Sequence, residues 1–296
     1  MVEKVLLFKG VIKVLDFDQI YKEQLDLFFK EDDLQRNMLY LAKLPTEVVQ
    51  CQLKLKDDLI LAGLPFFVAV FNYLKRDVLN YSEFKEYEGK KFIKDEFKDI
   101  NFELPFNVVL TGERIALNLL QRASGIATNV ARYASKLEDI SILDTRKTTP
   151  GLRFLEKYAV TLGGGVNHRF GQMDAWMIKD NHKNIFGGVE KAVNYFKSLS
   201  TFYQPLILEI HKIEEIEIGL RNGVRHFLLD NFTPSMLSQA IAIKQAGVTY
   251  EVSGGVTLEN LSEFSIAGID AISSGAMVYN APTVDISLKY YPKKFV

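Results

Sequence analysis

The sequence predicts an α/β protein whose C-terminal half forms an incomplete or modified parallel barrel. From residue 140 onward, short apolar strands alternate with helical stretches, a pattern typical of parallel βαβ units. This series lacks the glycine fingerprint of a dinucleotide-binding sheet, which favours a closed or nearly closed barrel. Polar residues follow nearly every strand at its C-terminal end, where an α/β barrel carries its active site.

Composition describes an ordinary globular protein. The chain has 296 residues, 48% hydrophobic and 25% charged, enough to bury a sizeable core in one or two domains. Its net charge of −1 gives no reason to expect a nucleic-acid or membrane partner. The single Cys51 excludes an internal disulfide and a four-cysteine metal site, and we expect a buried, inert thiol. Since Val5–Phe8 is too short for a signal-peptide core, we expect a cytoplasmic enzyme.

The first hundred residues predict mixed helices and strands without a catalytic constellation. Residues 16–30 have helical spacing, 48–55 alternate like a strand, and 65–74 are apolar enough for a buried helix. A turn is expected at residues 88–90, where glycine stands between two charged residues. This part of the chain therefore indicates a fold but no function.

A longer helix is predicted after these elements. Thr111 can cap a helix, so we expect the helix to begin there, and Glu113 suits the positive end of the helix dipole. Ile115, Leu119 and Ala123 recur at helical spacing, which predicts the buried face of the helix.

The predicted C-terminal strands end in polar residues that sort by charge. The strands are expected at residues 140–143, 174–178, 206–210, 226–229, 250–252 and 271–273. The early exits are cationic: Arg146, Lys147, His168, Arg169 and Lys179. The middle exits are the acids Glu209 and Asp230. The late exits are small and glycine-rich: Ser253-Gly254-Gly255 and Ser274-Gly275-Ala276.

Each group of exits predicts a different part of a ligand. The planar fork of arginine pairs with carboxylates or phosphates, so the cationic group predicts a polyanionic substrate. The two acids could hold a divalent metal or sugar hydroxyls. The late turns offer backbone N–H groups at helix starts, in the loops where a barrel characteristically binds phosphate. Together they predict a polyanionic acid and a phosphorylated sugar that can bring a metal.

Single residues outside this pattern are less informative. The polar loop around His168 favours a functional role over a core histidine, whereas His211 and His226 are expected to be structural or solvated. Gly163-Gly164-Gly165 fits a close approach to a ligand and a flexible turn equally well. Three basic residues could support the site or face water, and we expect them to face water: Arg122, Arg153 and Lys157.

The order and spacing of these motifs resemble the quinolinate phosphoribosyltransferase family from about Thr111 to Leu288. The matching segments are Glu113–Asn118, Ser124–Thr128, Asp144–Arg153, Gly163–Arg169, Lys179–His182, Leu229–Asn231, Ser253–Gly255 and Ala281–Ser287. Over residues 1–110 the resemblance is poor. There the family usually has a Glu-Asp segment followed by spaced glycines, and this chain has only Glu31-Asp32-Asp33.

The resemblance implies an N-terminal α/β sandwich domain and an incomplete α/β barrel with its active site at the C-terminal strand ends. The sandwich is expected to comprise residues 1–112 and a returning C-terminal strand within 283–296, and the barrel residues 113–282. Residues 285–291 alternate in the way that the returning strand requires. The family is dimeric, so the resemblance also implies a homodimer with an active site shared between subunits.

The activity that the resemblance implies belongs to NAD biosynthesis. The enzyme would be a pentosyltransferase, nicotinate-nucleotide diphosphorylase (carboxylating). It would transfer phosphoribosyl from phosphoribosyl pyrophosphate to quinolinate with decarboxylation, giving nicotinate mononucleotide, CO₂ and pyrophosphate. Mg²⁺ is the implied cofactor, brought by the substrate pyrophosphate, with Glu209 and Asp230 as its candidate protein ligands.

The resemblance also implies residue roles, with Lys147, Lys179, Glu209 and Asp230 as the catalytic set. The quinolinate carboxylates would be bound by Arg146, His168, Arg169 and Lys179, with Arg114 reaching in from the neighbouring subunit. Lys147 would meet the pyrophosphate with help from Lys179. Glu209 and Asp230 would hold the ribose hydroxyls and the metal. The substrate-binding loops would add Thr145, Ser253, Gly254, Gly255, Ser274, Gly275 and Ala276, the last six around the 5′-phosphate.

One departure and three alternatives accompany this hypothesis. Ile207 stands where the family often has a second glutamate, and we take Glu209 as the functional acid. A related enzyme could act on another heteroaromatic acid, since only the carboxylate contacts would differ. A Schiff-base lyase is the second alternative, because Lys179 at a strand end suits an amine nucleophile. A catalytically silent barrel that only binds a ligand is the third.

Overall fold

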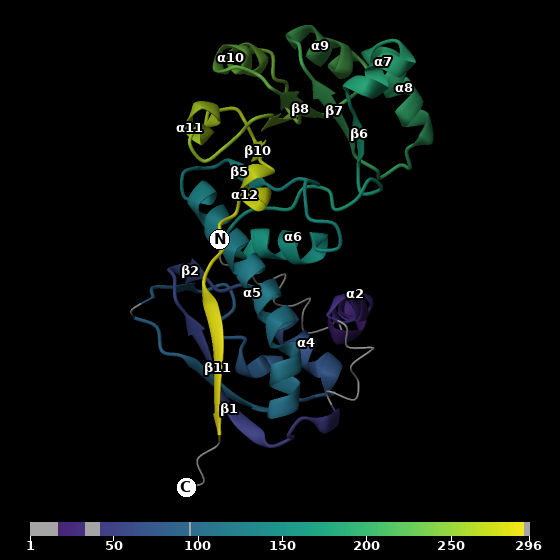
Figure 1. The fold of residues 1–296 in the computed structure, drawn as a ribbon. Helices are drawn as coiled ribbons and strands as arrows, with labels where there is room; N and C mark the ends of the chain where they lie inside the picture. Colours follow the sequence, from purple (N-terminus) through teal and green to yellow (C-terminus); the bar gives the residue numbers. More distant parts are fainter. Residues whose placement is uncertain (1–16, 33–41, 95, 293–296) are drawn as a thin grey trace. The chain divides into compact units, whose positions relative to one another are not determined.

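The computed structural model describes residues 17–32, 42–94 and 96–292 (Figure 1). Within these residues the chain forms two compact units. The first contains the described part of Met1–Asn129 together with Pro150–Gly164 and Ala281–Val296, and the second contains Val130–Thr149 and Gly165–Asn280. Val5–Phe8 and Asp33, which the sequence analysis considered, lie outside the described residues.

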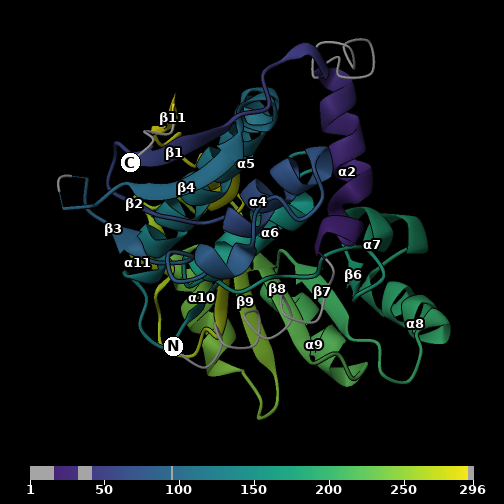
Figure 2. The same cartoon turned by 90° about the horizontal axis from the view of Figure 1, so that it is seen from below.

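The first unit is built on an antiparallel sheet with the strand order β11-β1-β4. Strand β1 (Val48–Leu55) lies between β4 (Ile100–Pro105) and β11 (Ile286–Pro292), as the pairing of Leu53 with both Ile100 and Leu288 shows (Figure 2). The structure thus confirms the predicted strand at 48–55 and the returning C-terminal strand. Burial raises the pKa of the Cys51 thiol on β1 to about 12, in agreement with an inert cysteine.

The remaining elements of the first unit are mainly helical. The helices are α2 (Phe17–Glu31), α4 (Leu64–Leu74), η1 (Tyr81–Glu83), α5 (Phe106–Ala134) and α6 (Arg153–Leu162). Helix α5 continues into the second unit. Strands β2 (Leu59–Ile60) and β3 (Lys91–Phe92) form a separate two-stranded sheet. The helices predicted from residues 16–30 and 65–74 are confirmed by α2 and α4 within the described residues. Residues Leu64 to Phe71 of α4 are all buried, as their continuous apolar sequence predicts.

A buried carboxylate organises the start of α4. The Glu88 side chain is only 4% exposed and accepts the N–H groups of Gly63 at 2.7 Å and Leu64 at 3.0 Å. The Tyr158 hydroxyl of α6 donates to the same carboxylate at 2.8 Å. The turn predicted at residues 88–90 therefore places an anion at a helix N-terminus, where backbone N–H groups lack helical partners.

Helix α5 begins earlier than predicted. It starts at Phe106, directly after β4, and the Thr111 hydroxyl donates to the Asn107 carbonyl at 2.7 Å instead of capping the helix. The prediction of a helix start at Thr111 was wrong because a threonine within a helix can bond to the carbonyl four residues before it. The boundary expected between residues 112 and 113 lies inside this helix, which runs on to Ala134.

The first unit also includes helix α6, which the sequence analysis placed in the barrel. Arg122 of α5 makes an ion pair with the fully buried Glu156 of α6 at 2.8 Å. Lys157 is 2% exposed and Arg153 is partly buried, so the expectation that these three basic residues face water was wrong. Buried partners such as Glu156 come from tertiary packing, which the local sequence does not show.

The second unit contains a parallel sheet with the strand order β5-β10-β9-β8-β7-β6. Its strands are β5 (Ser141–Leu143), β6 (Trp176–Ile178), β7 (Leu206–Ile210), β8 (His226–Asp230), β9 (Thr249–Ser253) and β10 (Ala271–Ser273). Its helices are α7 (Asp180–Phe186), α8 (Val189–Leu199), α9 (Ile213–Arg221), α10 (Pro234–Ala242), α11 (Leu261–Phe264) and α12 (Ala276–Tyr279). Figures 1 and 2 show α8, α9 and α10 along one face of this sheet.

The barrel is incomplete, as the sequence predicts. Strands β5 and β6 are the two edges of the sheet, and no pairing joins them within the part of the chain that the structure describes. A single parallel bridge between Leu143 and Val166 extends the sheet beside β5. Residues at one level of neighbouring strands share a face, and the pairs Glu209–Leu228, Leu228–Glu251 and Asp230–Ser253 set the levels used below. Among the described helices, none combines the length and the hydropathy that crossing a bilayer requires.

Candidate active site

The second unit contains a cavity of about 550 Å³ at the C-terminal ends of its parallel strands. Its lining includes these predicted site residues: Thr145, Arg146, Lys147, His168, Arg169, Lys179, Glu209, Asp230, Ser253, Gly254, Gly255, Ser274, Gly275 and Ala276. The structure thus brings together residues spread over 132 sequence positions, from 145 to 276, counting both ends. The remaining predicted residue, Arg114, belongs to α5 in the first unit, where it is exposed. The roles of all these residues stay predictions.

Two arginines form the cationic wall of the cavity. The Arg169 guanidinium donates to the Ala175 carbonyl at 3.0 Å and approaches the Met177 sulfur at 3.6 Å, which holds it against the strand end. Burial lowers the pKa of Arg169, and the positive charge of Arg146 lowers it further. A wall that holds two neighbouring positive charges, one of them partly desolvated, would be stabilised by a ligand with two negative charges.

Lys179 and Glu209 form an ion pair across neighbouring strand ends. The Lys179 Nζ donates to Glu209 Oε2 at 2.7 Å, and the Glu209 carboxylate is almost fully buried. The backbone N–H of Lys179 donates to His182 Nδ1 at 2.9 Å, so the first turn of α7 fixes the position from which the lysine extends. The lysine therefore lies where it can contact both the acidic group and a ligand in the cavity.

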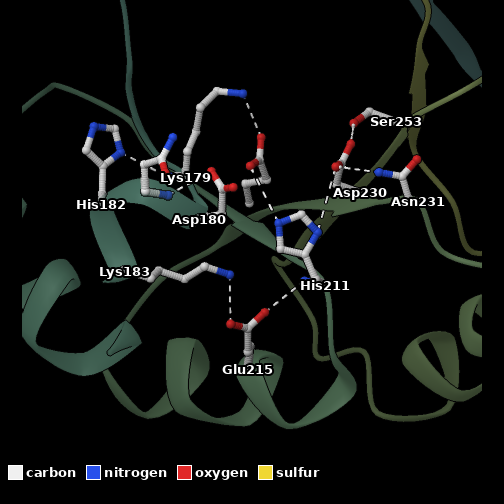
Figure 3. Close-up of polar contacts among 11 residues, drawn as sticks. Lys179, Asp180, His182, Lys183, His211, Glu215, Asp230, Asn231 and Ser253 are labelled. Atoms are coloured by element: carbon white, nitrogen blue, oxygen red, sulfur yellow. Dashed lines mark hydrogen bonds and ion pairs between the residues drawn. The ribbon is translucent and has the colours of Figure 1, made fainter. Parts of the chain in front are cut away.

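Asp230 is held by its own turn and by the next strand. Ser253 Oγ donates to Asp230 Oδ1 at 2.6 Å, and Asn231 Nδ2 donates to Oδ2 at 2.8 Å (Figure 3). The strand register places Asp230 level with Ser253, which explains why these side chains meet. The carboxylate is thereby oriented before any ligand arrives.

His211 lies between the two acids, a position that sequence reasoning missed. Its Nε2 is 3.8 Å from Glu209 Oε1, and its Nδ1 is 3.7 Å from Asp230 Oδ2. One ligand atom from each of these residues lies within 4.8 Å of the others, a spacing that a metal ion could bridge. Its position could have indicated this role, because His211 directly follows β7 and stands two residues after Glu209. His226, by contrast, contacts Thr249 Oγ1 at 2.8 Å, in agreement with a structural histidine.

A third carboxylate, that of Glu215, holds the backbone of His211. Glu215 of α9 accepts Lys183 Nζ at 2.7 Å and the backbone N–H of His211 at 2.8 Å (Figure 3). Burial by itself would raise the pKa of Glu215, but these hydrogen bonds outweigh it and lower the pKa. Glu215 therefore stays ionised and keeps the turn after β7 in place.

Glycine is required in the two turns after β9 and β10 because neighbouring atoms leave no room for a Cβ. Gly254 has φ +91°, and a Cβ at this position would lie 2.3 Å from Asn231 Oδ1 and 2.7 Å from Asn231 N. At Gly275, a Cβ would lie 3.0 Å from Lys147 Cδ, a tight contact with the early cationic loop. The turn at Gly275 thus lies against Lys147, which lines the cavity, and the turn at Gly254 lies against Asn231, which holds Asp230. Glu251 also lines it and was not predicted, although it stands two residues before Ser253 on the same strand face.

The comparisons with known proteins agree over nearly the whole chain. Residues 126–289 match the family model "Quinolinate phosphoribosyl transferase, C-terminal domain", and residues 33–124 match the N-terminal domain of the same family. Human nicotinate-nucleotide pyrophosphorylase [carboxylating] is 36% identical over 252 residues, which cover 83% of each chain. Quinolinate phosphoribosyltransferase [decarboxylating] 1b of Nicotiana tabacum is 35% identical, with 79% of this chain and 71% of that protein covered. The crystal structure of NadC from Streptococcus pyogenes superposes with a TM-score of 0.80 and 34% identity, covering 91% of this chain and 96% of that one.

Proposed function

The chain belongs to the quinolinate phosphoribosyltransferase family, and from this premise we propose that it converts quinolinate and phosphoribosyl pyrophosphate into nicotinate mononucleotide, CO₂ and pyrophosphate. The proposal rests on one observation. A single cavity is lined by the cationic wall, by the acids Glu209 and Asp230, and by two glycine-rich turns. The wall suits the two carboxylates of quinolinate, and the acids and turns suit a phosphorylated sugar.

In the proposed mechanism the chain mainly positions the reactants and balances their charge. Arg146 and Arg169 bind the quinolinate carboxylates, and Lys147 neutralises charge on the departing pyrophosphate. The electron-deficient ribose carbon is captured by the pyridine nitrogen, which becomes cationic. That cation stabilises the carbanion formed when the C2 carboxylate leaves as CO₂, and the carbanion then takes up a proton. No electron acceptor beyond the substrate ring is needed.

Glu209 and Asp230 are proposed to hold the ribose hydroxyls and to face a Mg²⁺ ion that arrives with the pyrophosphate. The residues fit such an ion, because Mg²⁺ is usually bound by one or two carboxylates together with substrate phosphates. When bound, Mg²⁺ would supply further neutralisation of the leaving pyrophosphate. Lys179 pairs with Glu209 and keeps that carboxylate oriented toward the cavity.

We also propose a cytoplasmic homodimer in which Arg114 completes the neighbouring subunit's site. The support is the resemblance of the Arg114 motif to the family, together with the exposed position of Arg114 on α5. The Schiff-base lyase proposed as an alternative for Lys179 gains no support, since none of the relatives named above is a lyase.

The decisive experiment compares quinolinate with nicotinate as the acceptor of the phosphoribosyl group. Quinolinate should give nicotinate mononucleotide, and nicotinate should be a poor substrate. A monoanion would leave one of the two half-buried arginines of the wall without a partner, and a site built for a dianion discriminates against such a ligand. Product formation by chromatography and kcat/KM for both acids are the measurements. Similar kcat/KM values would contradict the assignment and favour a related enzyme for another heteroaromatic acid.

Removing Mg²⁺ is expected to abolish activity without unfolding the protein. The proposed ion would be held by the Glu209 and Asp230 carboxylates together with the substrate pyrophosphate, so we expect the fold not to depend on it. Activity and the melting temperature should both be measured with and without EDTA, and activity should return on adding Mg²⁺. A melting temperature that falls sharply with EDTA would instead indicate a structural metal.

A further inference from the structure

Glu251 lines the cavity and contacts His168, the residue before Arg169 of the cationic wall. Glu251 Oε2 is 3.3 Å from His168 Nε2, and the two side chains are 14% and 10% exposed. The carboxylate comes from the middle of β9, level with Leu228 and one level deeper than Ser253. An acid is unexpected beside a wall that would bind carboxylates, because like charges repel. Its role must therefore differ from direct contact with the acid substrate.

The second ring nitrogen of His168 is engaged by the next residue. The backbone N–H of Arg169 donates to His168 Nδ1 at 2.6 Å. A nitrogen that accepts a hydrogen bond carries no proton, so the ring proton belongs on Nε2, facing Glu251. Both ring nitrogens thus have partners within the chain. This differs from the role that the resemblance implies for His168, which is direct binding of a quinolinate carboxylate.

The loop around His168 is fixed from the other side by a buried acid. Asp144, which is fully buried at the end of β5, accepts the His168 backbone N–H at 2.8 Å and Asn167 Nδ2 at 2.7 Å. The His168 backbone is thereby tied to β5 while its ring is tied to β9. Arg169 follows directly, and its own guanidinium is anchored on the Ala175 carbonyl.

We propose that Glu251 is a positioning residue for substrate binding: it fixes the Nε2–H tautomer of His168, whose Nδ1 then holds the Arg169 backbone in place. The inference takes its substrate, quinolinate, from the proposed function. The contact between Glu251 and His168 is independent of that function. The other carboxylate oxygen, Oε1, is buried and has no hydrogen-bond partner among the described residues. The contact with His168 is therefore what orients this carboxylate, and the two side chains depend on each other.

Three variants separate positioning from simple packing. Glu251→Leu removes the acceptor, so His168 should lose its tautomer preference and quinolinate should bind on the order of 10- to 100-fold more weakly, as expected for a displaced binding group. Glu251→Gln keeps an acceptor oxygen and should restore much of the binding. Phosphoribosyl pyrophosphate should bind all variants alike. Glu263→Gln, on the exposed face of α11, is the matched control and should change nothing.

The readouts are ¹⁵N NMR of the histidine rings and calorimetric titration with quinolinate and with phosphoribosyl pyrophosphate. The chain has 4 histidines, so a His168→Gln spectrum assigns the His168 signals. An Nδ1–H or doubly protonated His168 in the wild type at neutral pH would overturn the proposal. So would unchanged quinolinate affinity in Glu251→Leu.

Two further outcomes remain interpretable. If Glu251→Leu does not fold, Glu251→Gln and the wild-type spectrum still test the contact. If the wild type binds no quinolinate, the proposed function fails, while the tautomer of the free protein still reports on the contact between Glu251 and His168.

Discussion

Replacing Arg169 with lysine is expected to lower kcat/KM for quinolinate by roughly 10²- to 10⁴-fold, the equivalent of about 3–5 kcal/mol. In the free protein this guanidinium is partly desolvated and lies near the positive charge of Arg146, and its pKa is lowered for both reasons. One terminal nitrogen donates to the Ala175 carbonyl and the other approaches the Met177 sulfur, and the remaining N–H groups of the planar fork can pair with a carboxylate. A lysine ammonium has neither the fork nor the second anchoring nitrogen.

The measurement is steady-state kinetics with each substrate varied in turn. The loss should appear in the quinolinate parameters, while the KM for phosphoribosyl pyrophosphate should change little. Arg221→Lys, in the exposed last turn of α9, is the matched control and should keep wild-type kinetics. The melting temperatures of the variants should be similar, because Arg169 lines a cavity and is not part of the core. Near-wild-type activity of Arg169→Lys would rule out bidentate carboxylate binding.

The barrel and most of its cavity could be predicted because the signal repeats. Each strand ends in polar residues, and parallel strands bring those ends to one edge, so a local pattern carries three-dimensional information. Strands predicted at 206–210 and 271–273 have the observed limits, and the others differ by a few residues at their ends. The incomplete closure was also predictable, since the six strands fall short of the usual eight.

His211 and Glu251 could not be predicted in the same way. Each lies two residues from a residue that the strand-end pattern had selected, Glu209 and Ser253. Whether such a neighbour faces the cavity depends on strand register and on the turn that follows, which only the folded sheet defines. The contact between Glu251 and His168 joins positions 83 residues apart (251 − 168), and nothing local to either residue indicates it.

The first unit was less predictable for a different reason. Its packing depends on buried polar contacts such as that of Glu156 with Arg122, whose partners lie on separate helices. Residues 33–124 match the N-terminal domain of the family, although short motifs in this part of the chain gave only a poor resemblance. Local charge rules misplaced the exposure of Lys157 because tertiary packing buries it. The capping rule misplaced the start of α5 because Thr111 bonds within the helix instead of capping it.

Two inactive variants are expected to restore activity when they share a dimer. In the proposed homodimer, Arg114 serves the neighbouring site and Lys179 serves its own cavity. Arg114→Ala and Lys179→Ala should each be nearly inactive as pure dimers, because each removes a cation from every site. In a mixed dimer, one site combines an intact Lys179 from one chain with an intact Arg114 from the other. The second site lacks both cations.

Unfolding and refolding the two variants together in equal amounts tests this arrangement. Random pairing makes about half of the dimers mixed, each with one complete site, so roughly a quarter of wild-type activity should return. Each variant refolded alone is the control, and distinct affinity tags on the two chains show how many mixed dimers form. Activity that stays at the level of the single variants, despite mixed dimers, would place Arg114 in its own subunit's site or outside the reaction altogether.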